Sequence, residues 1–431
     1  MTSHPSRTVA ELESIGEASL QTGPFGTQLK ASEYVDEGIP VINVRNIGFG
    51  DVRKEDLEYL NEAKAEKLHQ HRLRKGDIVF GRKGAVERHA LIDDSVDGWI
   101  QGSDCLRLRI KSQDVCERYL SHYLKTQAHQ DWMQALCSFG ATMSSLNQDI
   151  VRRISFPAPR IEAQKKIAAT LTAYDELIEN NQRRIALLEK MAEEIYREWF
   201  VRLRFPGHDK VKIVKGVPEG WKSVKLENAF KFTGGGTPTK EVSRYWDSGD
   251  VNWFTPSDIT GAKGIFLERS GEQCTEEGLN NSSAKMFPAY SVMLTSRATI
   301  GAVGINLTPA CTNQGFITCI PNARYPLPYL YHWIKLAKPH FELLSGGATF
   351  AELTKGTFKR IEILTPPEPI ITEFARTELP LFKAIENHLR ANRKLTETRD
   401  KLLPRLISGK LSVENLDIQF PPSMVEPIHE T

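Results

Sequence analysis

Hydrophobic runs long enough to cross a membrane are missing from this sequence of 431 residues. No apolar stretch approaches the ~20 residues that a membrane-spanning helix needs. Residues 1–14 are polar and acidic, without an apolar core, so we expect no secretory signal peptide. Hydrophobic residues make up 40% of the chain and charged residues 26%, as in ordinary globular proteins. These features predict a cytoplasmic protein that does not contact a membrane.

Cysteine patterns and metal-binding motifs are missing as well. The six cysteines form no CxxC pair and no regular framework, which predicts reduced, mostly buried thiols. The histidines are scattered, without an HExxH motif or a Cys/His cluster. Because zinc sites need such clusters, we expect no metal in this chain.

Motifs for nucleotide and cofactor chemistry are the third absence. The sequence has no GxxxxGK(S/T) phosphate loop, no strand–GxGxxG–helix unit and no Asn-Pro-Pro-aromatic motif of amino-methyltransferases. Gly234–Lys240 is glycine-rich but lacks the Gly-Lys pair, so it favours a turn or a close backbone approach over a nucleotide site. We therefore expect no catalytic residues and no bound cofactor.

The sequence does contain an internal repeat, with an offset of 207 residues. Ser138–Thr142 returns as Ser345–Thr349, and Ile178–Asn180 returns as Ile385–Asn387. Each copy runs from a globular stretch through a Gly-Ala-Thr loop and a Pro-marked strand end to a long polar helix. A tandem duplication predicts pseudo-twofold symmetry, which suits a partner with two similar surfaces, such as duplex DNA.

Short strand patterns and helix patterns recur within each half. Ile39–Val44 and Asp77–Phe80 are rich in branched residues and lie next to glycines, as strands do. Tyr119–Leu136 has the pattern of one amphipathic helix, and Ile154–Phe156 is a strand that stops at a proline. In the second half, Val251–Thr255 takes the place of the first strand.

A heptad pattern marks two long helices. Between residues 162 and 200, apolar residues step by four and three, which favours a coiled-coil seam over a helix lying on its own domain. The second helix reuses the seam, although Glu378 and Arg399 break it and Pro380 should kink or restart the helix. The predicted seam residues are Ile167, Leu171, Tyr174, Ile178, Asn181, Ile185, Leu188, Ile385, His388, Asn392, Leu395 and Leu402.

Positive charge gathers in residues 67–88, although the net charge of the chain is only +2. Seven lysines and arginines in this stretch face only Asp77 and Glu87, beside glycines that allow close backbone approach. Such a cluster suits contacts with DNA phosphates, and a solvated basic face is the alternative. Ser296-Arg297 corresponds to Gly81-Arg82 in the repeat, so Arg82 and Arg297 are interpreted as a recurring pair.

Amide side chains near the strands are further candidates, because asparagine and glutamine read adenine whereas arginine reads guanine. Arg45-Asn46, Gln101 and Asn313-Gln314 have this chemistry. The Gly140–Thr142 and Gly347–Thr349 loops either touch the DNA backbone or cap the following strand, and the sequence leaves both open.

Together these residues resemble the specificity subunit of type I restriction-modification enzymes, over nearly the whole chain. The motifs that carry the resemblance are Gly23–Gly26, Ile39–Ile42, Pro218–Trp221, Gly235–Pro238, Trp253–Ile259, Ile195–Phe200 and Leu402–Gly409. The first five are similar to the beginnings of two target recognition domains. The last two are similar to the ends of the central and distal helices.

The resemblance implies a chain without enzymatic activity, in which two recognition domains each read half of a bipartite DNA sequence. It also implies three kinds of partner: double-stranded DNA, methyltransferase subunits and restriction/translocase subunits. S-adenosylmethionine and ATP are expected on those partner subunits. The residues predicted to contact DNA are Arg45, Asn46, Arg72, Arg74, Arg82, Lys83, Arg88, Thr237, Ser257, Arg297, Asn313 and Gln314.

The predicted fold class is α/β (α+β): globular recognition domains in tandem duplication, separated by two long antiparallel coiled-coil helices, with pseudo-twofold symmetry. The predicted segments are 1–158 and 204–365 for the two recognition domains, 159–203 and 366–410 for the central and distal helices, and 411–431 for a loose tail.

Two other functions remain alternatives. A DNA methyltransferase or nuclease with an unrecognised active site is disfavoured by the missing motifs. A duplicated scaffold that binds only proteins is disfavoured by the basic cluster. A steep salt dependence of DNA affinity would separate a DNA-binding protein from a scaffold.

Overall fold

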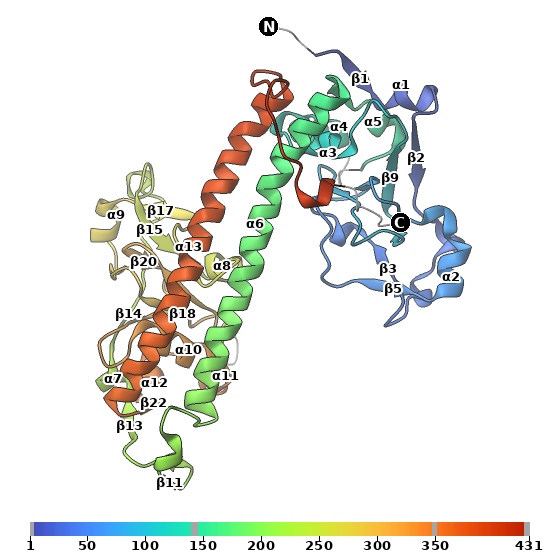
Figure 1. Ribbon diagram of the computed structural model, residues 1–431. Coiled ribbons are helices and arrows are strands. Elements are labelled where there is room, and N and C mark those ends of the chain that lie inside the picture. Colours follow the sequence, from blue (N-terminus) through green and yellow to red (C-terminus); the bar gives the residue numbers. More distant parts are fainter. Residues whose placement is uncertain (1–3, 139–144, 347–350, 426–431) are drawn as a thin grey trace. The chain divides into compact units, whose positions relative to one another are not determined.

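The computed structural model describes residues 4–138, 145–346 and 351–425 (Figure 1). The chain divides into unit 1, which comprises Met1–Ile178 and Lys394–Thr431, and unit 2, which comprises Glu179–Arg393. Both unit boundaries fall within long helices, α6 (Ile161–Tyr196) and α13 (Glu368–Ile407). Each unit therefore contains a globular part and a portion of both helices.

Unit 1 begins with a short strand that pairs with the strand before α6. Its strands are β1 (Ser6–Thr8), β2 (Ala18–Thr22), β3 (Ile39–Ile42), β4 (Phe49–Gly50), β5 (Glu58–Leu60), β6 (Ile78–Gly81), β7 (His89–Leu91), β8 (Ile100–Gln101), β9 (Cys105–Ile110) and β10 (Ser155–Pro157). Its helices are α1 (Val9–Ser14), α2 (Glu62–Lys67), α3 (Glu117–Leu124), α4 (Gln127–Ser138) and α5 (Gln148–Arg152).

Unit 2 repeats this order after the end of α6. Its strands are β11 (Ile213–Val214), β12 (Val217–Pro218), β13 (Lys222–Lys225), β14 (Lys231–Gly234), β15 (Val251–Phe254), β16 (Phe266–Leu267), β17 (Glu272–Cys274), β18 (Val292–Thr295), β19 (Val303–Asn306), β20 (Ala310–Thr312), β21 (Phe316–Ile320) and β22 (Glu362–Thr365). Its helices are α7 (Leu226–Ala229), α8 (Pro256–Thr260), α9 (Glu276–Asn280), α10 (Leu327–Leu336), α11 (Lys338–Leu344) and α12 (Lys355–Arg360).

The sheets of the two units have the same topology. Within the described residues, the larger sheet has the order β2-β9-β6-β7-β4 in unit 1 and β14-β21-β18-β19-β16 in unit 2. In both, the last pair is parallel and the others are antiparallel. The smaller sheets, β5-β3-β8 and β17-β15-β20, also correspond. The duplication that the sequence predicts is therefore present strand by strand.

The central strands of the larger sheets are fully buried because they consist almost entirely of apolar residues. All four residues of β6 and all four of β18 are buried. This burial on both faces is what near-continuous apolar runs predict. In each unit, the core continues from the sheet onto the helices that precede α6 and α13.

The two long helices pack against each other in opposite directions. In unit 1, Ile167 and Leu171 of α6 share a core with Leu406 of α13. In unit 2, Ile185 of α6 shares a core with Ile385. Since the start of α6 meets the end of α13, the helices are antiparallel within each unit.

Two expectations about helices, and one about the tail, need correction. Helix α13 is continuous through Pro380, because buried Phe374 and Phe382 on either side pack in the core of unit 2. The single helix expected at 119–136 is two helices, α3 and α4, which are separated at residues 125–126.

The tail was expected to be loose, but its described part is bound to unit 1. Val413 is buried in the core of the unit. Lys166 Nζ donates hydrogen bonds to the carbonyl oxygens of Glu414 and Leu416, both at 2.8 Å, and Arg118 donates to the Ser423 carbonyl at 3.0 Å. The polar composition concealed these anchors, which come from residues far away in the chain.

Candidate functional site

The central strands β6 and β18 end at equivalent places, and these strand ends define the candidate site in each unit. Arg82 N donates to the Asp104 carbonyl at 2.9 Å, and Arg82 O accepts from Leu146 N at 2.8 Å. In unit 2, Ser296 makes the corresponding bonds with Gly315 and Leu353, at 2.7 and 2.9 Å. Ser296 therefore stands where unit 1 has Arg82.

This register corrects the pairing of Arg82 with Arg297. The true counterpart of Arg297 is Lys83, because Lys83 bridges Ser145 as Arg297 bridges Glu352. A shift of one residue along extended backbone turns a side chain to the opposite face. What recurs in the two units is thus an exposed cation, Lys83 or Arg297, and not the residue before it.

The recurring cations each have an acidic neighbour. Lys83 Nζ lies 3.3 Å from an Asp104 carboxylate oxygen, and Arg297 Nε lies 2.9 Å from Glu352 Oε1. Both cations are about half exposed. Exposed ion pairs contribute little to stability, so either cation can exchange its carboxylate for a phosphate at little cost.

Arg82 and Arg88 have a different environment, since each lies over an aromatic ring. The Arg82 guanidinium carbon is 5.4 Å from the centre of the Phe25 ring, and that of Arg88 is 5.3 Å from the Phe49 ring. Within the described residues, the Nε atoms of both arginines are buried and lack a hydrogen-bond acceptor.

The other arginines predicted in unit 1 lie on its surface or pair with acids. Arg45 is half exposed and pairs with Glu58 at 3.0 Å. Arg72 pairs with Glu62 at 3.2 Å and donates to the Gly98 carbonyl at 3.3 Å. Arg74 is exposed. Most of the cluster seen in the sequence is therefore spread among local ion pairs.

Two of the candidate amide side chains make hydrogen bonds inside the fold instead. Asn46 is fully buried, accepts from Asn43 N and donates to the carbonyls of Arg53 and Glu55. Gln101 is also buried and donates to the carbonyls of Gln21 and Cys105. Because their donors are used inside the fold, neither side chain is available to a base.

The candidates of unit 2 include a directly bonded pair of polar side chains. Thr237 Oγ1 donates to Gln314 Oε1 at 2.7 Å, which fixes the amide of the exposed Gln314. Asn313 is used locally, since its Oδ1 accepts from Gly315 N at 2.9 Å. Ser257 is exposed in the first turn of α8.

Gly235, just before this pair, has no room for a side chain. A Cβ atom there would lie 1.9 Å from the Asn313 carbonyl oxygen. The glycine-rich stretch is therefore a close backbone approach, as the sequence favoured. The Gly140–Thr142 and Gly347–Thr349 loops lie outside the described residues.

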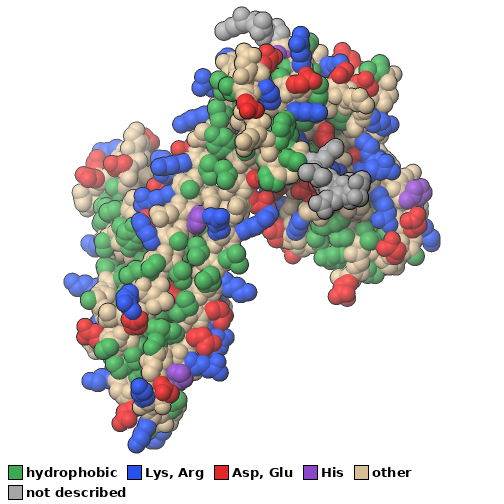
Figure 2. Space-filling model, viewed as in Figure 1, with side chains coloured by type: hydrophobic (Ala, Val, Ile, Leu, Met, Phe, Trp, Pro, Cys, Tyr) green, Lys and Arg blue, Asp and Glu red, His purple; other side chains and the backbone are tan. Residues whose placement is uncertain are grey.

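Basic and acidic side chains are interspersed over the visible surface (Figure 2). In unit 2, other exposed cations are also neutralised: Lys240 pairs with Glu272 at 2.8 Å and Arg244 with Glu277 at 2.8 Å. Lys240 and Arg244 also lie over aromatic rings, at 3.6 Å from Trp246 and 5.5 Å from Tyr245, but unlike Arg82 both are in ion pairs.

A polar cluster interrupts the helix seam within unit 2. Asn181 Nδ2 donates to Asn392 Oδ1 at 2.8 Å, and Asn181 Oδ1 lies 3.0 Å from His388 Nδ1. In unit 1, Arg399 pairs with Asp175 across the same two helices. Polar groups at seam positions fix the register of paired helices. The remaining predicted seam residues, including Tyr174, Ile178, Leu188, Leu395 and Leu402, are partly buried.

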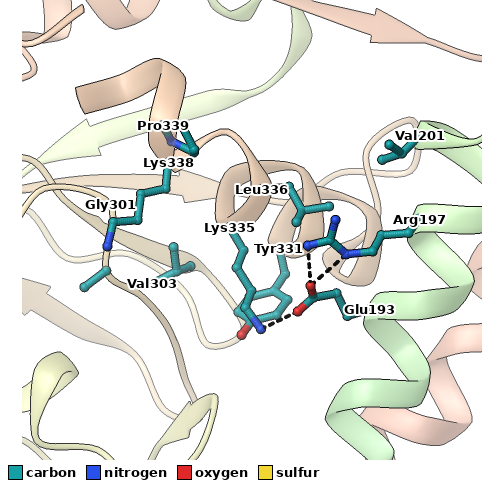
Figure 3. Close-up of a pocket in the computed structure, with 11 residues that line it drawn as sticks. Glu193, Arg197, Val201, Gly301, Val303, Tyr331, Lys335, Leu336, Lys338 and Pro339 are labelled. Carbon is teal, nitrogen blue, oxygen red and sulfur yellow. Dashed lines mark hydrogen bonds and ion pairs between the residues drawn. The ribbon is translucent and has the colours of Figure 1, made fainter. Parts of the chain in front are cut away.

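A cavity of about 700 Å³ lies in unit 2 between the end of α6 and the segment that contains α10 and α11 (Figure 3). Glu193 lines the cavity and binds both Arg197, at 2.7 Å, and Lys335, at 2.8 Å. Burial acts to raise the pKa of Glu193, but the hydrogen bonds from Lys335 and Arg197 outweigh this and lower the pKa. The ionised carboxylate therefore ties α6 to α10.

Buried ionisable groups occur at the contact between α10 and α13. His332 Nε2 lies 3.5 Å from Glu378 Oε2, and both side chains are almost completely buried. Burial lowers the pKa of His332 to about 3 and raises the pKa of Glu378 to about 8. At neutral pH this contact therefore joins two uncharged groups and is not an ion pair.

Two absences characterise the described residues. No group of three or more His, Cys, Asp or Glu side chains in them is arranged to hold a metal ion. None of the described helices is long and apolar enough to span a bilayer.

Sequence reasoning missed Phe25 and Phe49, on which the two arginines lie. The sequence pattern that could have identified them is a phenylalanine next to glycine, as in Gly23–Gly26 and Gly48–Gly50. It also missed the buried Glu378–His332 contact. The interruption of the heptad seam at Glu378 was the signal there, although it was interpreted as a failure of the pattern.

Comparisons with known proteins agree with one another. The family described as type I restriction modification DNA specificity domain matches residues 9–190 and 218–392. The HindI specificity subunit of Haemophilus influenzae is 24% identical over 403 residues, which cover 79% of this chain and 87% of that protein. A putative MjaX specificity subunit of Methanocaldococcus jannaschii is 25% identical and covers 90% of both chains.

A solved structure has the same fold. The specificity subunit of a type I restriction-modification system from M. genitalium superposes with a TM-score of 0.61 at 17% identity. The match covers 94% of this chain and 96% of that one.

Proposed function

This chain belongs to the type I restriction-modification DNA specificity family, and from that premise we propose that each unit reads one half of a bipartite DNA sequence. Because two copies of the specificity domain lie in one chain, one polypeptide can present two reading surfaces. The helices α6 and α13 then set the number of base pairs between the half-sites.

The observation that carries this proposal is the pair of equivalent strand ends. The two units share one topology but display different side chains at matched positions, with Arg82 in unit 1 and Ser296 in unit 2. A common framework with different exposed groups suits the reading of two different sequences, because base identity is read by side chains at base edges.

We further propose that the chain is not itself catalytic. In a complex of this class, methyl transfer and DNA translocation belong to partner subunits, which bind S-adenosylmethionine and ATP. The specificity chain supplies the DNA contacts and the docking surface, and works with these partners in the cytoplasm.

The helices offer a surface for the methyltransferase subunits. Leu187 and Met191 of α6 are 62% and 53% exposed. They lie four residues apart and therefore on one helix face, away from the buried Ile185. Exposed apolar side chains at this spacing are suited to packing against a partner helix.

Exchange of one unit's globular part tests half-site reading. Residues 221–365 would be replaced by the corresponding part of another specificity subunit, and the methylated motif would be sequenced in cells that also contain the methyltransferase partner. We expect one half of the motif to change while the other half is retained. A motif that changes in both halves, or in neither, would contradict the proposal.

Salt dependence tests whether DNA is the ligand at all. Phosphate contacts release counterions, so the logarithm of the affinity should fall linearly with the logarithm of salt concentration. A complex that shows no DNA affinity at low salt would instead support a scaffold that binds only proteins.

A further inference from the structure

The loop between β6 and β7 carries two arginines that lie over two exposed phenylalanines. Arg82 begins this loop and Arg88 ends it, while Phe25 and Phe49 come from other segments of unit 1. The phenylalanine side chains are 55% and 41% exposed. A single exposed ring needs no explanation, but here the same loop places an arginine on each of two rings.

An aromatic ring that stacks under a guanidinium group leaves the hydrogen-bond donors of that group free. The ring covers one face of the planar cation, whereas the N–H donors point outward in the plane. An arginine in an ion pair has already committed its donors to a carboxylate. Stacking therefore restricts the orientation of the side chain without occupying the donors that would recognise a ligand.

Arg82 and Arg88 fit this description. Within the described residues, Arg82 has no carboxylate partner, and the carboxylate nearest to Arg88 is that of Glu87, 4.0 Å from Nε. The buried Nε atoms of both arginines lack an acceptor there. Neither side chain makes a hydrogen bond to a carboxylate within the described residues, so the terminal nitrogen atoms of each guanidinium group are the donors left for a ligand.

Unit 2 does not reproduce the feature at matched positions. The strand registers place Thr237 where unit 1 has Phe25, because Thr22 pairs Leu106 as Gly234 pairs Ile317. The hydroxyl of Thr237 is bonded to Gln314. Unit 2 thus presents a hydroxyl–amide pair where unit 1 presents a ring with a guanidinium.

We propose that Phe25 and Phe49 are positioning residues that hold Arg82 and Arg88 for recognition of guanine in the half-site read by unit 1. This inference rests on the proposed function of the chain. Guanine offers two acceptors, N7 and O6, on its major-groove edge, and the fork of an arginine matches both. The inference assigns the base that these arginines recognise and the two residues that orient them.

The test uses the chain in complex with its methyltransferase partner, after sequencing of the methylated motif. Affinities would be measured for the cognate duplex and for duplexes in which each guanine of one half-site is replaced by 7-deazaguanine, which lacks N7. Arg82→Lys keeps the charge but loses the fork. We expect it to reduce a preference of roughly 5- to 150-fold at one guanine, with the salt dependence unchanged.

The phenylalanine variants test positioning. Phe25→Ala should reduce the same preference while Phe25→Tyr, which retains the ring, should preserve it. Phe49→Ala should act at a different guanine, through Arg88. Because both rings are exposed, melting temperatures should stay close to that of the wild type.

Arg244→Lys in unit 2 is the matched control. Arg244 also lies over a ring, that of Tyr245 at 5.5 Å, but it is paired with Glu277. This variant should leave every guanine preference of the unit 1 half-site unchanged.

Two outcomes would overturn the inference and leave the proposed function intact. In one, the wild-type complex binds its motif but Arg82→Lys and Phe25→Ala keep all guanine preferences. In the other, the variants weaken binding equally for every sequence, which indicates a phosphate contact. A wild-type complex that prefers no sequence would instead refute the proposed function itself.

Discussion

At the scale of single residues, the buried carboxyl group of Glu378 gives the clearest physical consequence. Glu378 has no hydrogen-bond partner within the described residues, and burial raises its pKa to about 8. An unfolded glutamate titrates near a pKa of about 4.3. The folded state therefore binds one proton more than the unfolded state between these two values, and stability must fall as pH rises through this range.

Buried histidines oppose the pH dependence of stability that Glu378 causes. Burial lowers the pKa of His332 to about 3 and that of His122 to about 3, so both favour the folded state increasingly as pH rises towards 6.5. That trend opposes the effect of Glu378 at low pH. Burial also lowers the pKa of His71, His89 and His129, and unfolded histidines still bind protons just above pH 6.5. The effect of Glu378 is therefore seen in the difference between the wild type and a variant that lacks its carboxyl group.

We predict that the stability of Glu378→Gln relative to the wild type rises by roughly 2 kcal/mol between pH 6.5 and 8, because each pH unit of such linkage is worth about 1.4 kcal/mol. Urea unfolding at several pH values measures it. Glu342→Gln, at an exposed glutamate, is the control and should keep the wild-type slope. If Glu378→Gln and the wild type had the same slope in this window, Glu378 would have to be ionised in the folded protein.

At the scale of elements, α6 uses different faces for different purposes. Ile185 and Ala192 are buried in the seam, whereas Leu187 and Met191 are exposed. The heptad pattern of the sequence identified the first face because core positions repeat regularly. It did not identify the second face, since a heptad pattern marks only the residues that pack in the seam.

We predict that Leu187→Asp and Met191→Asp each weaken binding of the methyltransferase subunit by at least tenfold, since a carboxylate at an apolar interface loses hydration without a partner. Titration calorimetry with the purified subunit measures the affinity. Leu343→Asp is the control, because Leu343 is 82% exposed and lies on α11, not on α6 or α13. Equal affinities for all three variants would place the docking surface elsewhere.

At the scale of the whole molecule, the two long helices connect the two units. Both unit boundaries lie within helices, at residues 178–179 and 393–394. The polar contacts of the seam, such as Asn181 with Asn392 and Asp175 with Arg399, each lie within a single unit. Residues inserted at the two boundaries would therefore leave these contacts intact.

We predict that one heptad inserted at each boundary lengthens the DNA spacer by about three base pairs. Seven helical residues add ~10.5 Å, and each base-pair step spans ~3.4 Å. A heptad preserves the seam register in both helices. Sequencing of the methylated motif gives the spacer, and both half-sites should be unchanged. An active complex with the original spacer would refute the role of the helices as a ruler.

Much of the fold was determined by local patterns of the sequence. The repeat predicted two equivalent halves and with them β15, the branched runs predicted β3 and β6, and the heptads predicted α6 and α13. Periodicity suffices for these features because strands and helices bury one face or stripe at a fixed spacing. The family resemblance also followed from motif order, without any knowledge of contacts.

The tertiary structure decided the features that depend on residues far apart in the chain. Strand pairing showed that Lys83, and not Arg82, corresponds to Arg297. Folding also buried Asn46 and placed Phe25 under Arg82. No local pattern contains these facts, because a side chain's exposure and hydrogen-bond partners are set by whichever distant segments pack against it.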